Sequence, residues 1–138
     1  KLINLKIKSA LKSGLKVIFC IGETLQEKRK KVTKLVLSKQ INLGLNNIKN
    51  KKNIIIAYEP VWSIGTNKIL KNIELKKIIK FIKSEYKKNF KLKSDPKVLY
   101  GGSVNPANIK SMRLLKGPQA ATIYGEEGTW GVILIKTK

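Results

Sequence analysis

The stretch Asn53–Lys68 (NIIIAYEPVWSIGTNK) decides the fold class. It opens with a continuous apolar run, Ile54–Ala57, which is typical of a strand covered on both faces in a parallel sheet. A glutamate follows closely, and a proline then starts a loop. Active sites of parallel α/β sheets lie where loops leave the carboxyl ends of the strands. Glu59 is therefore the first candidate for a functional residue.

Strand and helix periods alternate on both sides of this stretch. Two further short apolar runs, Val17–Ile21 and Val98–Tyr100, are predicted to be strands. Apolar residues at helical spacing predict helices over Lys1–Ser13, from the capping-box pair Thr24 and Glu27 to Ile48, over Asn72–Asn89, and from Asn105. Regular alternation of this kind indicates an α/β fold with a parallel sheet, either open or closed into a barrel.

The composition narrows the possible classes. The chain has 138 residues, enough for one modest domain, and no apolar run approaches the roughly 20 residues that span a bilayer. It lacks an initiator Met and a signal-peptide core, so we expect it to begin inside a larger protein. Its single cysteine fits a reducing compartment such as the cytoplasm. Histidine is absent from the sequence, so an ordinary zinc site is not expected, and no cofactor is predicted.

The formal net charge is +22, from 30 Lys and Arg against 8 Asp and Glu. Strongly basic chains often bind nucleic acid, so a nucleic-acid-binding module is one alternative. However, the lysines are spread over every polar helix face, and Arg29 and Arg113 are the only arginines. Arginine is the residue that supplies bidentate contacts to bases and phosphates. The charge therefore does not favour a dedicated nucleic-acid role.

Glu59 is suited by position to act as a general base. A carboxylate in a partly apolar mouth is expected to have a raised pKa, which favours proton abstraction. The alternative is a solvated glutamate, or one paired with a lysine. The loop that follows, Pro60–Lys68, carries the apolar residues Val61, Trp62 and Ile64. It is interpreted either as a lid that excludes water or as a loop packed permanently on the fold.

Three other places carry weaker signals. The turn Gly101-Gly102-Ser103 follows a predicted strand, where backbone N–H groups can bind a phosphate, although many such turns merely need glycine. Cys20 is interpreted as a small core residue rather than a nucleophile, because no histidine accompanies it. Glu23 either forms a positioning salt bridge or caps the next helix.

Residues 1–112 resemble the second half of the triosephosphate isomerase family. Gly14–Glu27 (GLKVIFCIGETLQE) resembles that family's fifth strand and the turn after it. Ala57–Lys68 (AYEPVWSIGTNK) resembles the sixth strand with its catalytic glutamate and lid, and Tyr100–Asn105 (YGGSVN) resembles the seventh strand and phosphate loop. The resemblance implies a partial (β/α) barrel of the TIM type.

The resemblance also implies an activity, the interconversion of dihydroxyacetone phosphate and glyceraldehyde 3-phosphate in glycolysis and gluconeogenesis. Glu59 would be the base, the Gly65 N–H and Ser103 would bind the substrate phosphate, and Tyr100 would latch the closed lid. Triosephosphate isomerase is itself a standard example of lid closure. The lid would comprise Pro60, Val61, Trp62, Ser63, Ile64, Gly65, Thr66, Asn67 and Lys68, with Asn67 standing where the family usually has glycine.

The departures from the family predict an inactive chain. The family's electrophilic histidine and substrate-binding lysine belong to the first half of the barrel, which this sequence does not contain. Loss of one such hydrogen-bond donor typically costs about 10²–10³ in rate. We therefore expect the missing N-terminal half-barrel to be a required partner, the full-length enzyme to be a homodimer, and no membrane association.

The end of the chain departs further. Leu114–Lys138 (LLKGPQAATIYGEEGTWGVILIKTK), which ends in the predicted β run Val132–Ile135, resembles the end of the plug domain in TonB-dependent outer-membrane receptors. The resemblance divides the chain into residues 1–112 and a tail, 113–138, produced by a chimeric join. A fragment of such a receptor plug is the alternative function from another class.

Overall fold

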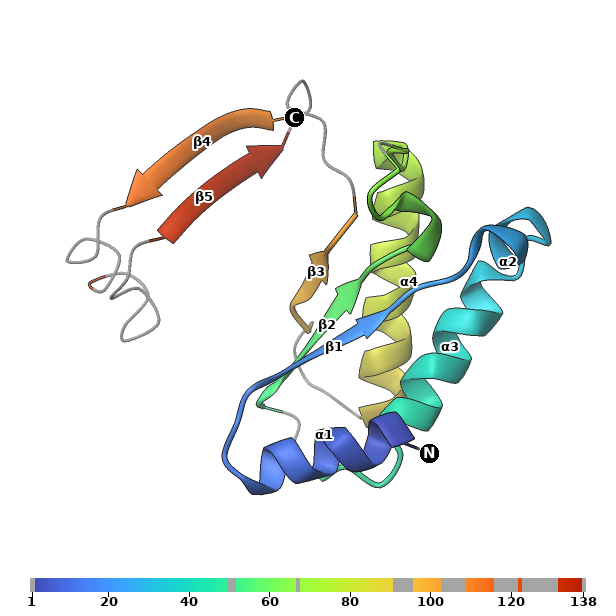
Figure 1. Ribbon diagram of the computed structural model, residues 1–138, viewed down its shortest axis with the longest axis vertical. Helices are drawn as coiled ribbons and strands as arrows, with labels where there is room; N and C mark the ends of the chain where they lie inside the picture. The colour runs from blue at the N-terminus through green and yellow to red at the C-terminus, as the bar shows by residue number, and fades with distance from the viewer. Residues whose placement is uncertain are drawn as a thin grey trace. The chain divides into compact units, whose positions relative to one another are not determined.

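The computed structural model describes residues 2–49, 52–66, 68–90, 96–102, 109–115, 122 and 132–137. They belong to two compact units, residues 1–103 and 104–138. The first unit contains, in order, α1 (Leu2–Lys12), β1 (Val17–Ile21), α2 (Leu25–Arg29), α3 (Thr33–Gly44), β2 (Ile54–Tyr58), the 3-10 turn η1 (Val61–Ser63), α4 (Asn72–Phe90) and β3 (Val98–Tyr100) (Figure 1). The second contains β4 (Ile109–Leu115) and β5 (Val132–Thr137).

The first unit is built from β/α repeats. Its strands lie in the order β1-β2-β3 and pair in parallel, with Val17 opposite Ile54 and Ile56 opposite Val98. Helices α2 and α3 connect β1 to β2, and α4 connects β2 to β3. The three strands and α4 were predicted within one residue of these bounds. The arrangement fits the predicted partial β/α barrel, because parallel strands joined by helices are its repeating unit.

The connection between β1 and β2 differs from the prediction. Helix α2 starts at the predicted capping box, in which the Thr24 N–H donates to Glu27 Oε2 at 2.7 Å and the Glu27 N–H donates to Thr24 Oγ1 at 3.3 Å. The helix then stops, because Lys31 has a φ of 58°, which a helix cannot contain. The single helix expected up to Ile48 is therefore two helices, and Leu35, at an apolar position of that period, is exposed.

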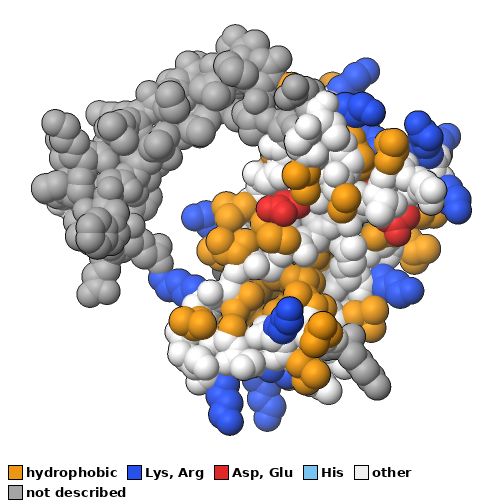
Figure 2. Space-filling model, viewed as in Figure 1, with side chains coloured by type: hydrophobic (Ala, Val, Ile, Leu, Met, Phe, Trp, Pro, Cys, Tyr) orange, Lys and Arg blue, Asp and Glu red, His pale blue; other side chains and the backbone are white. Residues whose placement is uncertain are grey.

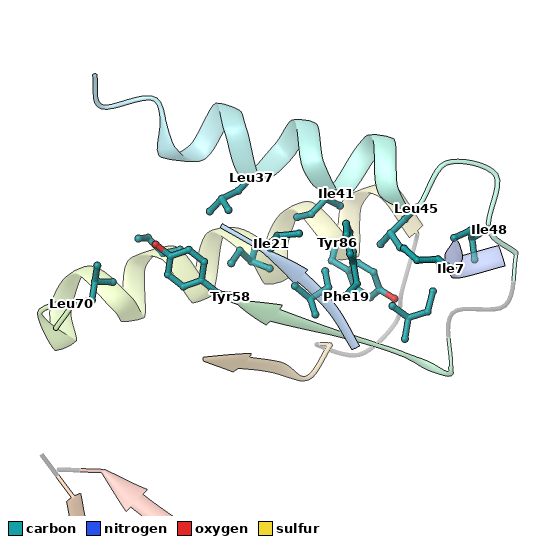
Figure 3. Packing of buried hydrophobic residues seen from close by; sticks show 14 residues of the cluster. Ile7, Phe19, Ile21, Leu37, Ile41, Leu45, Ile48, Tyr58, Leu70 and Tyr86 are labelled. Atoms are coloured by element: carbon teal, nitrogen blue, oxygen red, sulfur yellow. The ribbon is translucent and has the colours of Figure 1, made fainter. Parts of the chain in front are cut away.

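The core fills the space between the helices and one face of the sheet. Figure 3 shows Leu37 and Ile41 of α3 pointing toward Ile21 of β1. The predicted apolar stripe of α4 takes part in this packing, with Ile78, Ile82 and Tyr86 buried and Leu75 and Ile79 packed against the cluster. The whole cluster comprises Ile7, Phe19, Ile21, Leu37, Ile41, Leu45, Ile48, Ile54, Ile56, Tyr58, Leu70, Ile78, Ile82 and Tyr86.

The opposite face of β1 is exposed. Successive side chains of a strand point to opposite faces, and Phe19 and Ile21 are buried while Ile18 and Cys20 are exposed. The interpretation of Cys20 as a buried core residue is therefore wrong, since its side chain lies on the face away from the core. On the face shown in Figure 2, hydrophobic side chains gather over the middle and lysines lie mostly around the rim.

The second unit does not continue the β/α pattern. Strands β4 and β5 pair antiparallel, with Met112 opposite Ile135 and Leu115 opposite Val132. The β run predicted from Val132 is confirmed. The helix predicted from Asn105 is wrong from Ile109 onward, because β5 supplies a strand whose backbone groups pair with that segment. The residues before Ile109 lie outside the described part, and the predicted boundary between residues 112 and 113 stays a prediction.

Within the described ranges, none of the helices is long and apolar enough to cross a bilayer.

Candidate active site

Glu59 lies at the carboxyl end of β2, as predicted. Its N–H donates to the Ile21 carbonyl at 2.8 Å, which extends the pairing of β1 and β2 by one residue beyond Tyr58. By the alternation of a strand, its side chain lies on the same face as Ala57, away from the helices. The side chain is half-buried. Pairing within the sheet therefore fixes the backbone of Glu59.

Gly101, directly after β3, lets the Glu59 side chain lie across its Cα. The Gly101 N–H donates to the Tyr58 carbonyl at 2.9 Å, so Gly101 is the neighbour of Glu59 across the sheet. A Cβ at position 101 would stand 2.5 Å from Glu59 Oε1 and 2.7 Å from its Cγ. Such separations are far inside van der Waals contact, so any larger residue would displace the carboxylate.

Gly22, after β1, supports the same residue through the backbone. A Cβ there would stand 1.8 Å from the Glu59 carbonyl oxygen. Gln40 of α3 holds Gly22 in place, because the Gly22 N–H donates to Gln40 Oε1 and Gln40 Nε2 donates to the Gly22 carbonyl, each at 2.9 Å. This role of Gln40 could not be predicted from the sequence, since nothing distinguishes it from the other polar residues of its helix.

The Cys20 thiol is a neighbour of the Glu59 carboxylate. Partial burial of the thiol, the negative charge of Glu59 and a hydrogen bond to its carboxylate, in that order, raise the pKa of Cys20. A raised pKa keeps the sulfur protonated, so it donates to the carboxylate and is a poor nucleophile. A protonated thiol agrees with the sequence interpretation that Cys20 is not a nucleophile, whereas its exposure contradicts the interpretation as a core residue.

A shallow pocket of about 270 Å³ opens beside these residues. It offers a small ligand one carboxylate, the protonated thiol and apolar side chains from the loop after β2. A carboxylate that borders such a space can accept a proton from a bound ligand. The lining residues are Cys20, Ile21, Gly22, Gln40, Glu59, Val61 and Ile64.

Glu23 is buried and takes neither of its two predicted roles. Its Oε1 accepts from Trp62 Nε1 at 2.8 Å, and its Oε2 accepts from the Tyr58 hydroxyl at 3.1 Å. The cap of the next helix is Thr24 instead. Burial and the Glu23 charge raise the pKa of Tyr58, which keeps the phenol protonated as the donor. Glu23 thus joins the ends of β1 and β2 to the loop that follows.

The loop of residues 60–68 is anchored in its first half. The Val61 N–H donates to the Glu23 carbonyl at 3.0 Å, and Ser63 is fully buried with its hydroxyl 2.6 Å from the Lys68 carbonyl. The second half is exposed, and Gly65 has a φ of 66° with open space around it. The contacts of the first half fit the packed-loop interpretation, and the lid interpretation stays a prediction. Asn67 lies outside the described residues.

Of the remaining predicted site residues, Tyr100 lies in the described part of the chain. The Tyr100 ring lies 6.1 Å from that of Tyr58, and its buried hydroxyl has no hydrogen-bond partner among the described residues. Ser103 lies outside the described residues. The described part of the chain contains no cluster of three His, Cys, Asp or Glu side chains that could hold a metal ion.

One contact of the loop was missed by sequence reasoning. Lys28 of α2 places its Nζ 3.6 Å from the centroid of the Trp62 ring and 3.2 Å from Glu74 Oε1. Lys28 belongs to a run of four basic residues, 28–31, and nothing in the sequence distinguishes the one that contacts the loop. Only the packing of α2 against the loop distinguishes it.

The sequence is similar to those of triosephosphate isomerases. The family model of triosephosphate isomerase matches residues 1–120. The triosephosphate isomerase of Thermodesulfovibrio yellowstonii is 39% identical over 125 residues, which cover 90% of this chain and 51% of that protein. Those of Geotalea uraniireducens (41% over 127 residues, 89% and 51%) and Leptospira biflexa (44% over 115 residues, 79% and 46%) are similar. The chain spans about half the length of the curated relatives it matches.

Proposed function

The chain belongs to the triosephosphate isomerase family, and from this premise we propose that it supplies the catalytic base and part of the phosphate site of that enzyme. The reaction is the interconversion of dihydroxyacetone phosphate and glyceraldehyde 3-phosphate. The observation that carries the proposal is the place of Glu59, which lies across Gly101 at the carboxyl end of β2 and borders an open pocket.

In this proposal Glu59 moves one proton between two carbons. Its carboxylate takes the proton from the carbon beside the substrate carbonyl and returns it to the former carbonyl carbon. The hydroxyl proton of the first carbon passes to the former carbonyl oxygen in the same conversion. The developing negative charge on the substrate oxygens needs a hydrogen-bond donor, and this sequence has no histidine to provide one. Catalysis therefore requires a donor from outside this chain.

The loop of residues 60–68 is the proposed lid, and Gly65 and Ser103 are the proposed phosphate contacts. Supporting features are the anchored first half, the exposed second half and the positive φ at Gly65, which suits a backbone that must approach a ligand. The Tyr100 hydroxyl, without a partner among the described residues, is available to latch a closed lid. Asn67 is proposed to stiffen the C-terminal hinge.

The partner is proposed to be a complementary half-barrel with the family's histidine and lysine. Strand β1 pairs only with β2 among the described strands, so its outer edge offers unpaired backbone groups. Beside that edge, an apolar groove of about 350 Å³ separates β1 from α1. A strand of the partner would pair with β1 and fill this groove, which is lined by Ile3, Lys6, Ile7, Ala10, Val17, Ile18, Phe19 and Cys20.

The assembled enzyme is proposed to be a homodimer that acts in the cytoplasm. The single cysteine of the sequence is compatible with a reducing compartment.

Complementation tests the function. The purified chain is mixed with the N-terminal half of the Thermodesulfovibrio yellowstonii relative, and formation of dihydroxyacetone phosphate from glyceraldehyde 3-phosphate is followed. We expect no turnover with either half alone and turnover with both. Turnover that is absent from a stable, stoichiometric complex of the two halves would overturn the proposal.

For the tail, we propose that residues 113–138 derive from the plug domain of a TonB-dependent receptor and were joined to the isomerase segment. The support for a join is the antiparallel pair β4–β5, which is foreign to a barrel of parallel strands. The family match itself runs to residue 120, beyond the proposed boundary, and ends before β5. One long nucleic-acid read through the codons for residues 98 to 125 tests this. A read that diverges after about Asn108 would mean that two proteins were joined artificially, and a continuous read would make the fusion real.

A further inference from the structure

The Trp62 ring is held from two directions by opposite charges. In its plane, Nε1 donates to the buried Glu23 carboxylate at 2.8 Å. Over its face, the Lys28 ammonium lies 3.6 Å from the ring centroid. An indole face attracts a cation more strongly than the other aromatic rings do, and an ionised acceptor strengthens the in-plane hydrogen bond. The two contacts together fix both the position and the tilt of the ring.

Lys28 is itself oriented by a second contact. Its Nζ lies 3.2 Å from Glu74 Oε1, in the first turn of α4, and the two side chains are 27% and 45% exposed. An ion pair this exposed adds little stability of its own. Its effect is to hold the ammonium over the ring, so that α2, the loop and α4 meet at Trp62.

Trp62 belongs to the anchored half of the loop and also bonds to the exposed half. Thr66 Oγ1 donates to the Trp62 carbonyl at 2.8 Å, and Ile64 and Gly65 are exposed. We propose that Lys28 is a positioning residue that pins Trp62 and sets the fixed end of the moving segment after it. Without Lys28, the mobile segment extends back toward Pro60. This inference rests on the proposed function, in which residues 60–68 are the lid.

Hydrogen exchange on the full chain tests the inference. The amide groups of Val61 and Ser63 donate to the carbonyls of Glu23 and Pro60, so their exchange reports opening of the anchored half. Lys28→Met should raise exchange in peptides over residues 61–64 by about two- to tenfold, the range expected for loss of a cation–π contact. Exchange in β2 and in the middle of α4 should change by less than about twofold.

Matched variants separate positioning from general destabilisation. Lys28→Arg keeps a cation over the ring and should leave loop exchange near the wild-type rate. Lys34→Met removes a lysine whose Nζ lies 5.6 Å from the Phe81 centroid, between α3 and α4, and should not affect the loop. Glu74→Gln keeps Lys28 but frees it, and should give a smaller increase than Lys28→Met.

Two results would overturn the inference. One is wild-type loop exchange in both Lys28→Met and Glu74→Gln, and the other is an equal rise in Lys34→Met. If Lys28→Met does not fold, Glu74→Gln alone decides. The exchange measurement uses no substrate, so the two proposals can fail separately. If complementation fails but exchange in the loop still depends on Lys28, only the proposed function is contradicted.

Discussion

The two faces of the three-stranded sheet differ in what they contact and in what they can do. On one face, Phe19 and Ile21 pack against the helices and are almost inaccessible to water. On the other, Ile18 is 59% exposed, Cys20 is exposed and Glu59 borders a pocket. The first face supplies the burial that stabilises a fold, while the second holds the groups that could do chemistry.

This difference explains how half of a barrel can keep a recognisable site. The backbone of Glu59 is placed by hydrogen bonds within the sheet and by Gly22 and Gly101, all of which lie in this chain. Its side chain lies on the exposed face, which the proposed partner half-barrel would cover. In that proposal this chain positions the site from one side and the partner completes it from the other.

The largest expected effect is on the exposed face. In the complemented enzyme, Glu59→Gln should lower kcat by about 10²–10⁴, the usual contribution of a general base, because an amide cannot take up a proton at neutral pH. The measurement is isomerase turnover with the wild-type and variant chains bound to the same partner half. Full activity in the variant would refute the assignment of Glu59 as the base.

The covered face should control stability. Ile82→Ala on α4, at a fully buried position, should lower the free energy of unfolding by about 2–5 kcal/mol. Ile18→Ala makes the same change at an exposed strand position and should cost well under about 1 kcal/mol. Urea denaturation of the two variants measures the difference. Equal losses would mean that the exposed face is buried in solution, for example by self-association.

The elements that pack on the covered face could be predicted from the sequence, and the contacts elsewhere could not. The strands and α4 were predicted because apolar, β-branched runs and a regular apolar stripe indicate side chains that are buried within the chain itself. Leu35 and Cys20 were mispredicted, since an apolar or small side chain does not record which face its neighbours cover. The contacts of Gln40 and Lys28 depend on how α3 and α2 pack against loops distant in sequence, and periodicity carries no such information.

A smaller effect is expected where the two glycines support Glu59. In Gly101→Ala the new methyl group meets the flexible end of the Glu59 side chain, which can move away. Stability should change by less than about 1 kcal/mol, but the displaced carboxylate should lower complemented activity by about 10- to 100-fold. In Gly22→Ala the methyl group meets the Glu59 backbone carbonyl, which cannot move alone, so the loss should be in stability.

For Gly101→Ala and Gly22→Ala, urea denaturation measures the free energy of unfolding, and the complementation assay measures isomerase turnover. If Gly101→Ala keeps full activity, the conformation of Glu59 seen here is not the one that reacts.

The smallest effect concerns Cys20, the sole cysteine, and it tests whether the carboxylate and the thiol are coupled. The pKa of Cys20 is raised by partial burial, by the Glu59 charge and by a hydrogen bond to Glu59, so at pH 8 its thiolate fraction is below that of an ordinary cysteine. Because only the thiolate is alkylated, iodoacetamide should react more slowly with the folded chain than with the urea-unfolded chain.

Glu59→Gln removes the negative charge from that pKa shift, and it leaves the burial and an amide oxygen that can still accept from the thiol. The Cys20 pKa should fall, the thiolate fraction at pH 8 should rise, and alkylation should accelerate by about two- to fivefold. Glu85→Gln is the matched control, because Glu85 accepts a hydrogen bond from Ser38 between α3 and α4 and does not face the thiol. The reagent is uncharged, so the change in net charge does not itself alter its approach. An unchanged rate in Glu59→Gln would mean that the Glu59 charge does not raise the Cys20 pKa, and that the carboxylate and the thiol are not coupled through charge.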